Sequence, residues 1–127
     1  MRDFQQEAEG LQIAKGYRLV DVLAIWRYRV EQLAANHEAD ELVNCARALI
    51  PSLNKLMLSE EIDLGLRAEA ARTACSIALA LSIVPDDKSD IVAPLLKKSL
   101  KGIVECLRLP VAVQGRHVAA QTLSFLA

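Results

Sequence analysis

Apolar residues recur along the chain at spacings of three and four positions, as on one face of an α-helix. No segment alternates apolar and polar residues between turn signals, as a half-buried strand would. The clearest apolar stripe lies within Tyr17–Ala35 and consists of Leu19, Val22, Leu23, Trp26, Val30 and Leu33. The pattern predicts an all-α chain of about six helices. They occupy roughly residues 3–15, 17–35, 39–58, 64–82, 88–107 and 110–127.

Glycine, proline and short polar residues separate these stripes where helices begin and end. Gly16 is a natural stop for the first helix. In "ANHEADE", Asn36 has the side chain of a helix cap, and Glu38 and Asp40 suit the positive end of the helix dipole. Pro85 forces the residue before it out of helical geometry and ends the fourth helix.

Two pairs of segments resemble each other at a similar spacing. "LRAEAARTACSIALA" (66–80) aligns with "GRHVAAQTLSFLA" (115–127) at an offset of 49, which pairs small residues at several positions. "LIPSLNKLM" (49–57) aligns with "VAPLLKKSL" (92–100) at an offset of 43, set by Pro51 and Pro94. Both offsets lie in or just above the range of repeats built from helical hairpins.

These segments resemble the HEAT/armadillo class of helical repeats. In that class the first helix of a unit often carries a proline within a leucine-rich stripe, and the second often opens with an apolar residue, an arginine and an alanine-rich stretch. The resemblance implies a short right-handed α-solenoid with a single all-α domain over residues 1–127. Its parts would be an N-terminal helical cap (1–37), a first repeat (39–83) and a second repeat (88–127). The second repeat departs from the pattern, because Gly115 replaces Leu66. A compact multi-helix bundle is the alternative fold.

Composition narrows the classes of function. The chain has 127 residues, 53% of them apolar and only 4% aromatic, so one domain with a core of leucine, alanine, valine and isoleucine is expected. The net charge of −1 provides no general field for nucleic acid or an anionic membrane. The start of the chain does not read as a signal peptide, and its longest apolar run, "ACSIALALSIV", is about half a membrane span. We therefore expect an intracellular, cytoplasmic protein.

Candidate chemistry is sparse. The three cysteines form no CxxC pair, so reduced core thiols are expected rather than a metal site. Phosphate-binding and hydrolase motifs are absent from the sequence, and we predict a non-enzymatic protein with no cofactor, metal or small-molecule substrate. Lys97, Lys98, Lys101 and Arg108 form a basic cluster that fits a solvated helix face better than a nucleic-acid site.

The expected function is therefore protein–protein interaction or scaffolding, in a chain that is complete or part of a longer array. The predicted partner-binding residues are polar positions on the second helix of each repeat: Arg67, Glu69, Arg72, Thr73, Arg116, Gln121 and Thr122. The alternative is a self-associating helical bundle with a structural or regulatory role. Its homo-oligomer interface would contain Leu123, Phe125 and Leu126, because the chain ends on an apolar helix.

Overall fold

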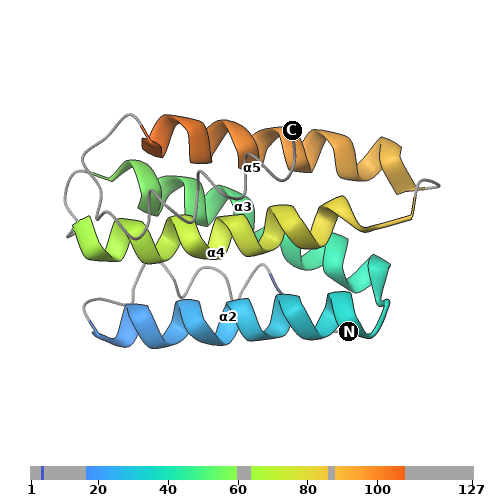
Figure 1. The fold of residues 1–127 in the computed structure, drawn as a ribbon, viewed down its shortest axis with the longest axis horizontal. Helices are drawn as coiled ribbons and strands as arrows, with labels where there is room; N and C mark the ends of the chain where they lie inside the picture. The colour runs from blue at the N-terminus through green and yellow to red at the C-terminus, as the bar shows by residue number, and fades with distance from the viewer. Residues whose placement is uncertain (1–3, 5–16, 60–63, 86–87, 108–127) are drawn as a thin grey trace.

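The computed structural model describes Phe4 and residues 17–59, 64–85 and 88–107 (Figure 1). These residues contain four α-helices and no strand, which confirms the all-α prediction. The helices are α2 (Tyr17–Ala35), α3 (Ala39–Leu58), α4 (Leu64–Ser82) and α5 (Ser89–Leu107). Their bounds agree with the predicted ones to within a residue. The predicted first helix, apart from Phe4, and the predicted sixth helix lie outside the described residues.

The four helices form two layers. Helices α2 and α4 lie side by side and run in the same direction, and α3 and α5 do the same in the opposite direction (Figure 1). Helix α4 contacts all three other helices, whereas α2 and α5 do not contact each other. In the described part of the chain, each layer therefore pairs helices that are second neighbours along the sequence.

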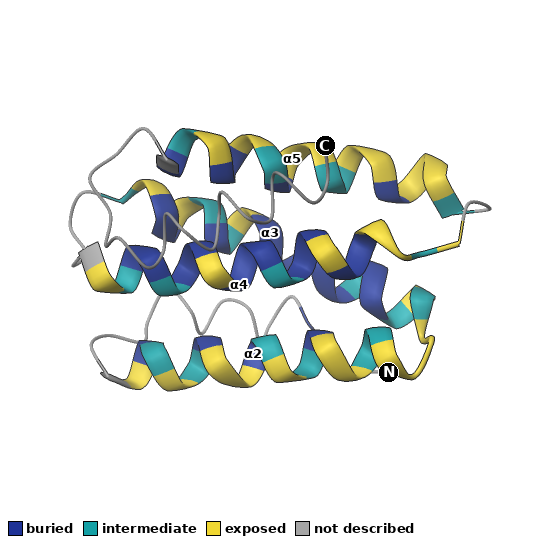
Figure 2. Cartoon of the chain, viewed as in Figure 1, coloured by how far each residue is buried: buried dark blue, intermediate teal, exposed yellow. Residues whose placement is uncertain are grey.

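The burial of each helix follows from its number of neighbours. Helix α2 lies at one side and buries a single stripe, consisting of Leu19, Leu23, Trp26 and Val30. Helix α4 lies between three helices and buries most of its surface, which its alanines make narrow enough for close packing (Figure 2). Its buried apolar side chains are Ala68, Ala70, Ala71, Ala74, Cys75, Ile77, Ala78, Ala80 and Leu81.

A tight turn joins α2 to α3 and corrects one expectation. His37 adopts a left-handed backbone conformation with φ 57°. Its N–H donates to the Ala34 carbonyl and the Glu38 N–H donates to the Leu33 carbonyl, which is the Schellman pattern of a helix C-terminus. Asn36 does not cap α3, because this turn places Glu38 at the N-cap, where no side chain caps the helix.

Helices α3 and α5 approach closely where Gly102 of α5 faces Asn54 of α3. A Cβ atom at Gly102 would lie 2.1 Å from Asn54 Oδ1. The Asn54 side chain also donates from Nδ2 to the Lys98 carbonyl, at 3.4 Å. The lack of a side chain at Gly102 thus leaves room for the Asn54 side chain between these two helices. A second contact between the same helices is an ion pair of 2.6 Å near the start of α5, which joins Lys88 Nζ to Asp40 Oδ1 in the first turn of α3.

None of the described helices combines the length and the apolar character needed to cross a bilayer.

Candidate functional site

Two of the polar residues predicted to bind a partner lie inside the molecule. Arg67 is only 6% exposed, and its Nε donates to the carbonyl of Ser59, the residue at the C-cap of α3. The negative end of the α3 dipole favours a cation at this position. Arg67 therefore stabilises the end of α3 and is not available on the surface of α4.

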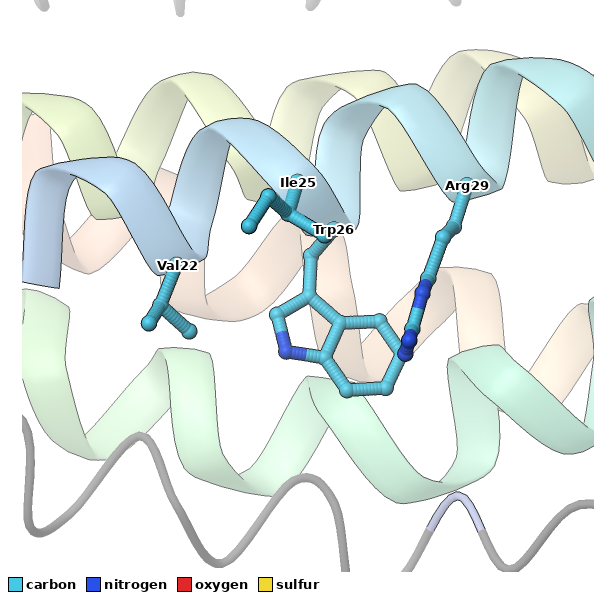
Figure 3. Close-up of a pocket in the computed structure, with 4 residues that line it drawn as sticks. All are labelled: Val22, Ile25, Trp26 and Arg29. Carbon is cyan, nitrogen blue, oxygen red and sulfur yellow. The ribbon is translucent and has the colours of Figure 1, made fainter.

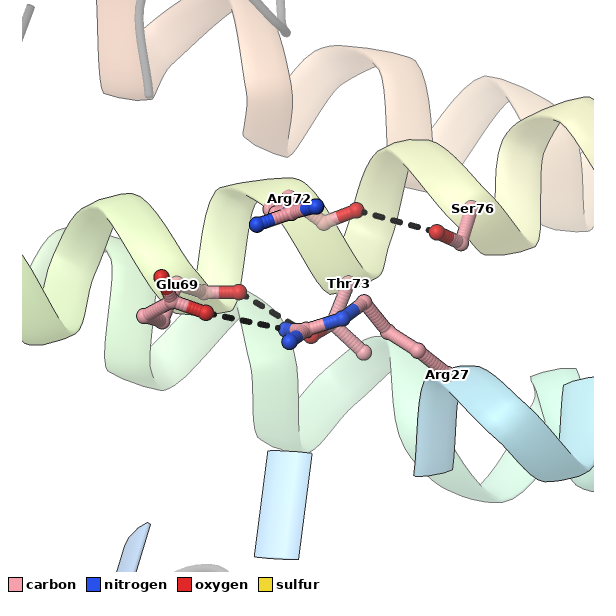
Figure 4. A network of polar contacts seen from close by, with 5 residues as sticks. All are labelled: Arg27, Glu69, Arg72, Thr73 and Ser76. Carbon is pink, nitrogen blue, oxygen red and sulfur yellow. Dashed lines mark hydrogen bonds and ion pairs between the residues drawn. The ribbon is translucent and has the colours of Figure 1, made fainter. Parts of the chain in front are cut away.

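Thr73 is fully buried and links α4 to α2 (Figure 4). Its hydroxyl donates to the Glu69 carbonyl one turn earlier and accepts a hydrogen bond of 3.0 Å from Arg27 Nη1. The same nitrogen forms an ion pair of 3.1 Å with Glu69 Oε2. Because the side chains of Arg27 and Glu69 are only 15% and 27% exposed, this network belongs largely to the interior of the α2–α4 layer.

Arg27 is the residue of this network that sequence reasoning missed, because it lies at the edge of the apolar stripe of α2. It bonds to Thr73, 46 positions further along the chain, so no local pattern in the sequence indicates it.

Arg72 is the predicted residue that the structure places on the surface. It lies on a narrow stripe of α4 that reaches the surface, on which Arg72 and Leu79 are exposed and Glu69 and Ser76 are half-buried. Ser76 binds within its own helix, donating to the Arg72 carbonyl at 3.3 Å (Figure 4). The other predicted residues lie outside the described part of the chain: Arg116, Gln121, Thr122, Leu123, Phe125 and Leu126.

A shallow groove of about 240 Å³ lies on α2, lined by Val22, Ile25, Trp26 and Arg29 (Figure 3). The Arg29 guanidinium carbon lies 4.8 Å from the centre of a Trp26 ring, within the range of a cation–π interaction. Phe4 packs against the same indole, with ring centres 6.1 Å apart. Trp26 is 3% exposed, so it supports the groove from beneath, as its place in the apolar stripe of α2 predicts.

The described residues offer little reactive chemistry. No three of their histidine, cysteine, aspartate or glutamate side chains gather where they could hold a metal ion. Cys45, Cys75 and Cys106 are buried and unbridged. Burial raises the pKa of the Cys106 thiol, and the positive charge of Arg67 offsets part of the rise. Cys106 is therefore a neutral thiol at physiological pH and a poor nucleophile.

Comparison of the chain with family models, curated proteins and solved structures gives no match in any of the three.

Proposed function

We propose that this chain is a short HEAT-like right-handed α-solenoid that acts as a non-enzymatic protein-interaction module. One observation carries the proposal. Polar contacts within each layer join residues separated by nearly the repeat spacing: 46 positions for Arg27 and Thr73 in the α2–α4 layer, and 44 for Asn54 and Lys98 in the α3–α5 layer. Stacking of similar hairpins produces such separations in both layers at once.

The absence of contact between α2 and α5 also supports stacking among the described helices. In a closed up-and-down bundle of four helices, the first and last helices pack together and close the core. Here α2 and α5 lie on opposite sides of α4 (Figure 1). Among the described helices, the first and the last therefore do not close the core against each other, as expected of a stacked array.

The partner-binding surface in this proposal is the exposed stripe of α4, with Arg72 at its centre. Arginine is enriched at protein interfaces because its planar guanidinium donates several hydrogen bonds and stacks on aromatic rings. The stripe is flanked by α2 and α5, both of which contact α4. A partner seated on Arg72 would therefore also meet side chains from the neighbouring helices.

Site-specific photo-crosslinking tests this surface. A photoreactive amino acid replaces Arg72 in one variant and Lys55, an exposed residue of α3 in the other layer, in a matched control. We expect a discrete protein adduct from position 72 in cells and none from position 55. Equal labelling at both positions, or none at position 72, would refute the proposed surface.

Self-association is the second candidate function, and one observation favours it. Ile25 and Tyr28 lie one turn apart on α2 and are 55% and 63% exposed. Neighbouring large apolar side chains on a surface are typical of interfaces. Light scattering decides between the candidates. A mass near 13.9 kDa favours a monomeric module. A dimer that Phe125→Glu or Tyr28→Lys converts to a monomer favours self-association.

A further inference from the structure

An apolar cavity of about 220 Å³ lies where the α2–α3 turn meets the C-terminal end of α4, just beyond Leu79, the last residue of the stripe around Arg72. We call it the notch. Its walls come from three segments, with Leu33 on α2, Leu42 on α3, and Ala80 and Ile83 at the end of α4 among the lining residues. Leu42 and Ala80 are buried, whereas Ile83 is 66% exposed. The notch therefore has an apolar floor and an apolar lip.

The walls of the notch are held in place without a ligand. His37 and Glu38 line one side, and their backbone N–H groups make the two hydrogen bonds of the Schellman turn. On the opposite side, the N–H groups of Ile83 and Val84 donate to the carbonyls of Ala80 and Leu81 and fix the last turn of α4. A preformed site loses little conformational entropy when it binds.

The size of the notch fits one large apolar side chain. A dry cavity of about 150 Å³ lined by aliphatic side chains is sufficient to bind benzene. The larger notch is open to solvent at the exposed lip around Ile83, so a side chain of another molecule can enter it.

The charge around the notch is negative. Glu38 lines it, and Glu41 lies in the first turn of α3, whereas Asp40 is neutralised by its ion pair of 2.6 Å with Lys88. The C-terminal ends of α2 and α4 add the negative ends of two helix dipoles, and the start of α3 adds one positive end. Positive groups on a ligand would therefore be attracted to the rim.

We propose that the notch binds a peptide segment of a partner protein that carries one large apolar side chain next to lysine or arginine. The apolar side chain enters between Leu42 and Ala80 and covers Ile83, while the cation lies near Glu38. This site is separate from the Arg72 surface, so a failed crosslink at position 72 leaves it standing, and the reverse also holds.

The test uses the full chain with labelled methyl groups and a capped peptide, Gly-Arg-Leu-Arg-Gly. We expect saturable shifts of the Leu42, Ala80 and Ile83 methyl signals, with a Kd on the order of 1 mM, as for a single-residue anchor. Gly-Arg-Ser-Arg-Gly lacks the anchor and should not shift them. Gly-Glu-Leu-Glu-Gly reverses the charge and should bind several-fold more weakly.

Two variants and one control locate the binding. Ala34→Leu adds a large side chain to the α2 wall of the notch and should abolish the shifts. Glu38→Lys should weaken binding about fivefold. Asp21→Lys makes the same charge change on an exposed residue near the other end of α2 and should leave the affinity unchanged. Retained methyl spectra would show that each variant folds.

Three results would overturn the proposal. One is the absence of shifts up to roughly 10 mM peptide. Another is equal binding of the serine peptide, which would indicate a general charge effect. The third is a concentration-dependent shift of the same methyl signals without peptide, together with a doubled mass, which would make a second copy of the chain the occupant.

Discussion

Replacing Gly102 by alanine tests the close approach of α3 and α5. A Cβ atom at this position would lie 2.1 Å from Oδ1 and 2.7 Å from Cγ of Asn54, well inside van der Waals contact. Asn54 Nδ2 donates to the Lys98 carbonyl, and Asn54 Oδ1 is buried without a hydrogen-bond partner. The Asn54 amide must therefore move away from α5 when the methyl group is added.

Two effects of opposite sign determine how Gly102→Ala changes the free energy of unfolding. Alanine in place of an interior helix glycine stabilises by about 1 kcal/mol. Overpacking typically destabilises by about 1–3 kcal/mol, and the displaced amide also loses its hydrogen bond. We expect Gly102→Ala to lower the free energy of unfolding by about 1 kcal/mol. Once Asn54→Ala has removed the obstacle, the same change should raise it by about 1 kcal/mol.

Urea unfolding of the original chain, both single variants and the double variant measures the coupling between the two sites. The two expected effects of Gly102→Ala differ by about 2 kcal/mol, which is the predicted coupling energy for residues in contact. If Gly102→Ala stabilises the chain equally with asparagine or alanine at position 54, the close approach does not limit the packing of these helices and the reasoning is wrong.

Three further predictions concern a turn residue, an ion pair and a buried thiol. His37→Gly should raise the free energy of unfolding by about 0.5–1 kcal/mol in a urea titration, because glycine adopts the left-handed conformation at φ 57° without strain; a loss of stability would contradict this account of the turn. A cycle of Arg27→Gln and Glu69→Gln should give a coupling energy of about 1 kcal/mol at low salt, since the pair is largely shielded from water; additive effects would mean that the ion pair does not hold α2 to α4. Because burial raises the pKa of the Cys106 thiol, the thiol ionises at lower pH in the unfolded chain than in the folded one. Stability should fall as pH rises above the ordinary thiol pKa, and Cys106→Ala should show a smaller fall in unfolding midpoint between about pH 8 and pH 10.

The helix bounds were predictable because apolar periodicity and terminating residues are local properties of the chain. The apolar stripe of α2 recurs every three or four residues, and Pro85 excludes helical geometry at the residue just before it. The helix ends were less predictable in chemical detail. Asn36 has the side chain of a cap, yet the backbone places Glu38 there, because the Schellman turn depends on the conformation of His37.

The surface of α4 was harder to predict, because exposure depends on how many helices surround a residue. Arg67 and Thr73 are polar and were expected on the surface, but α4 has three neighbours and uses both residues for internal hydrogen bonds. Arg72 is exposed only because it lies on the narrow stripe that these neighbours leave open. The notch joins three segments distant in sequence, and no local pattern indicates it.

The lack of contact between α2 and α5 has a consequence for how the chain folds during its synthesis. Helices α2, α3 and α4 all contact one another, so they can pack together before α5 is added. The contacts that hold each layer together close loops of moderate length, 44 and 46 residues in the two polar examples. Loop-closure entropy grows only slowly with length, so each of these loops costs only slightly more to close than a loop of half its length. We therefore expect the nascent chain to fold stepwise from its N-terminal side, each new helix docking on a surface that has already formed.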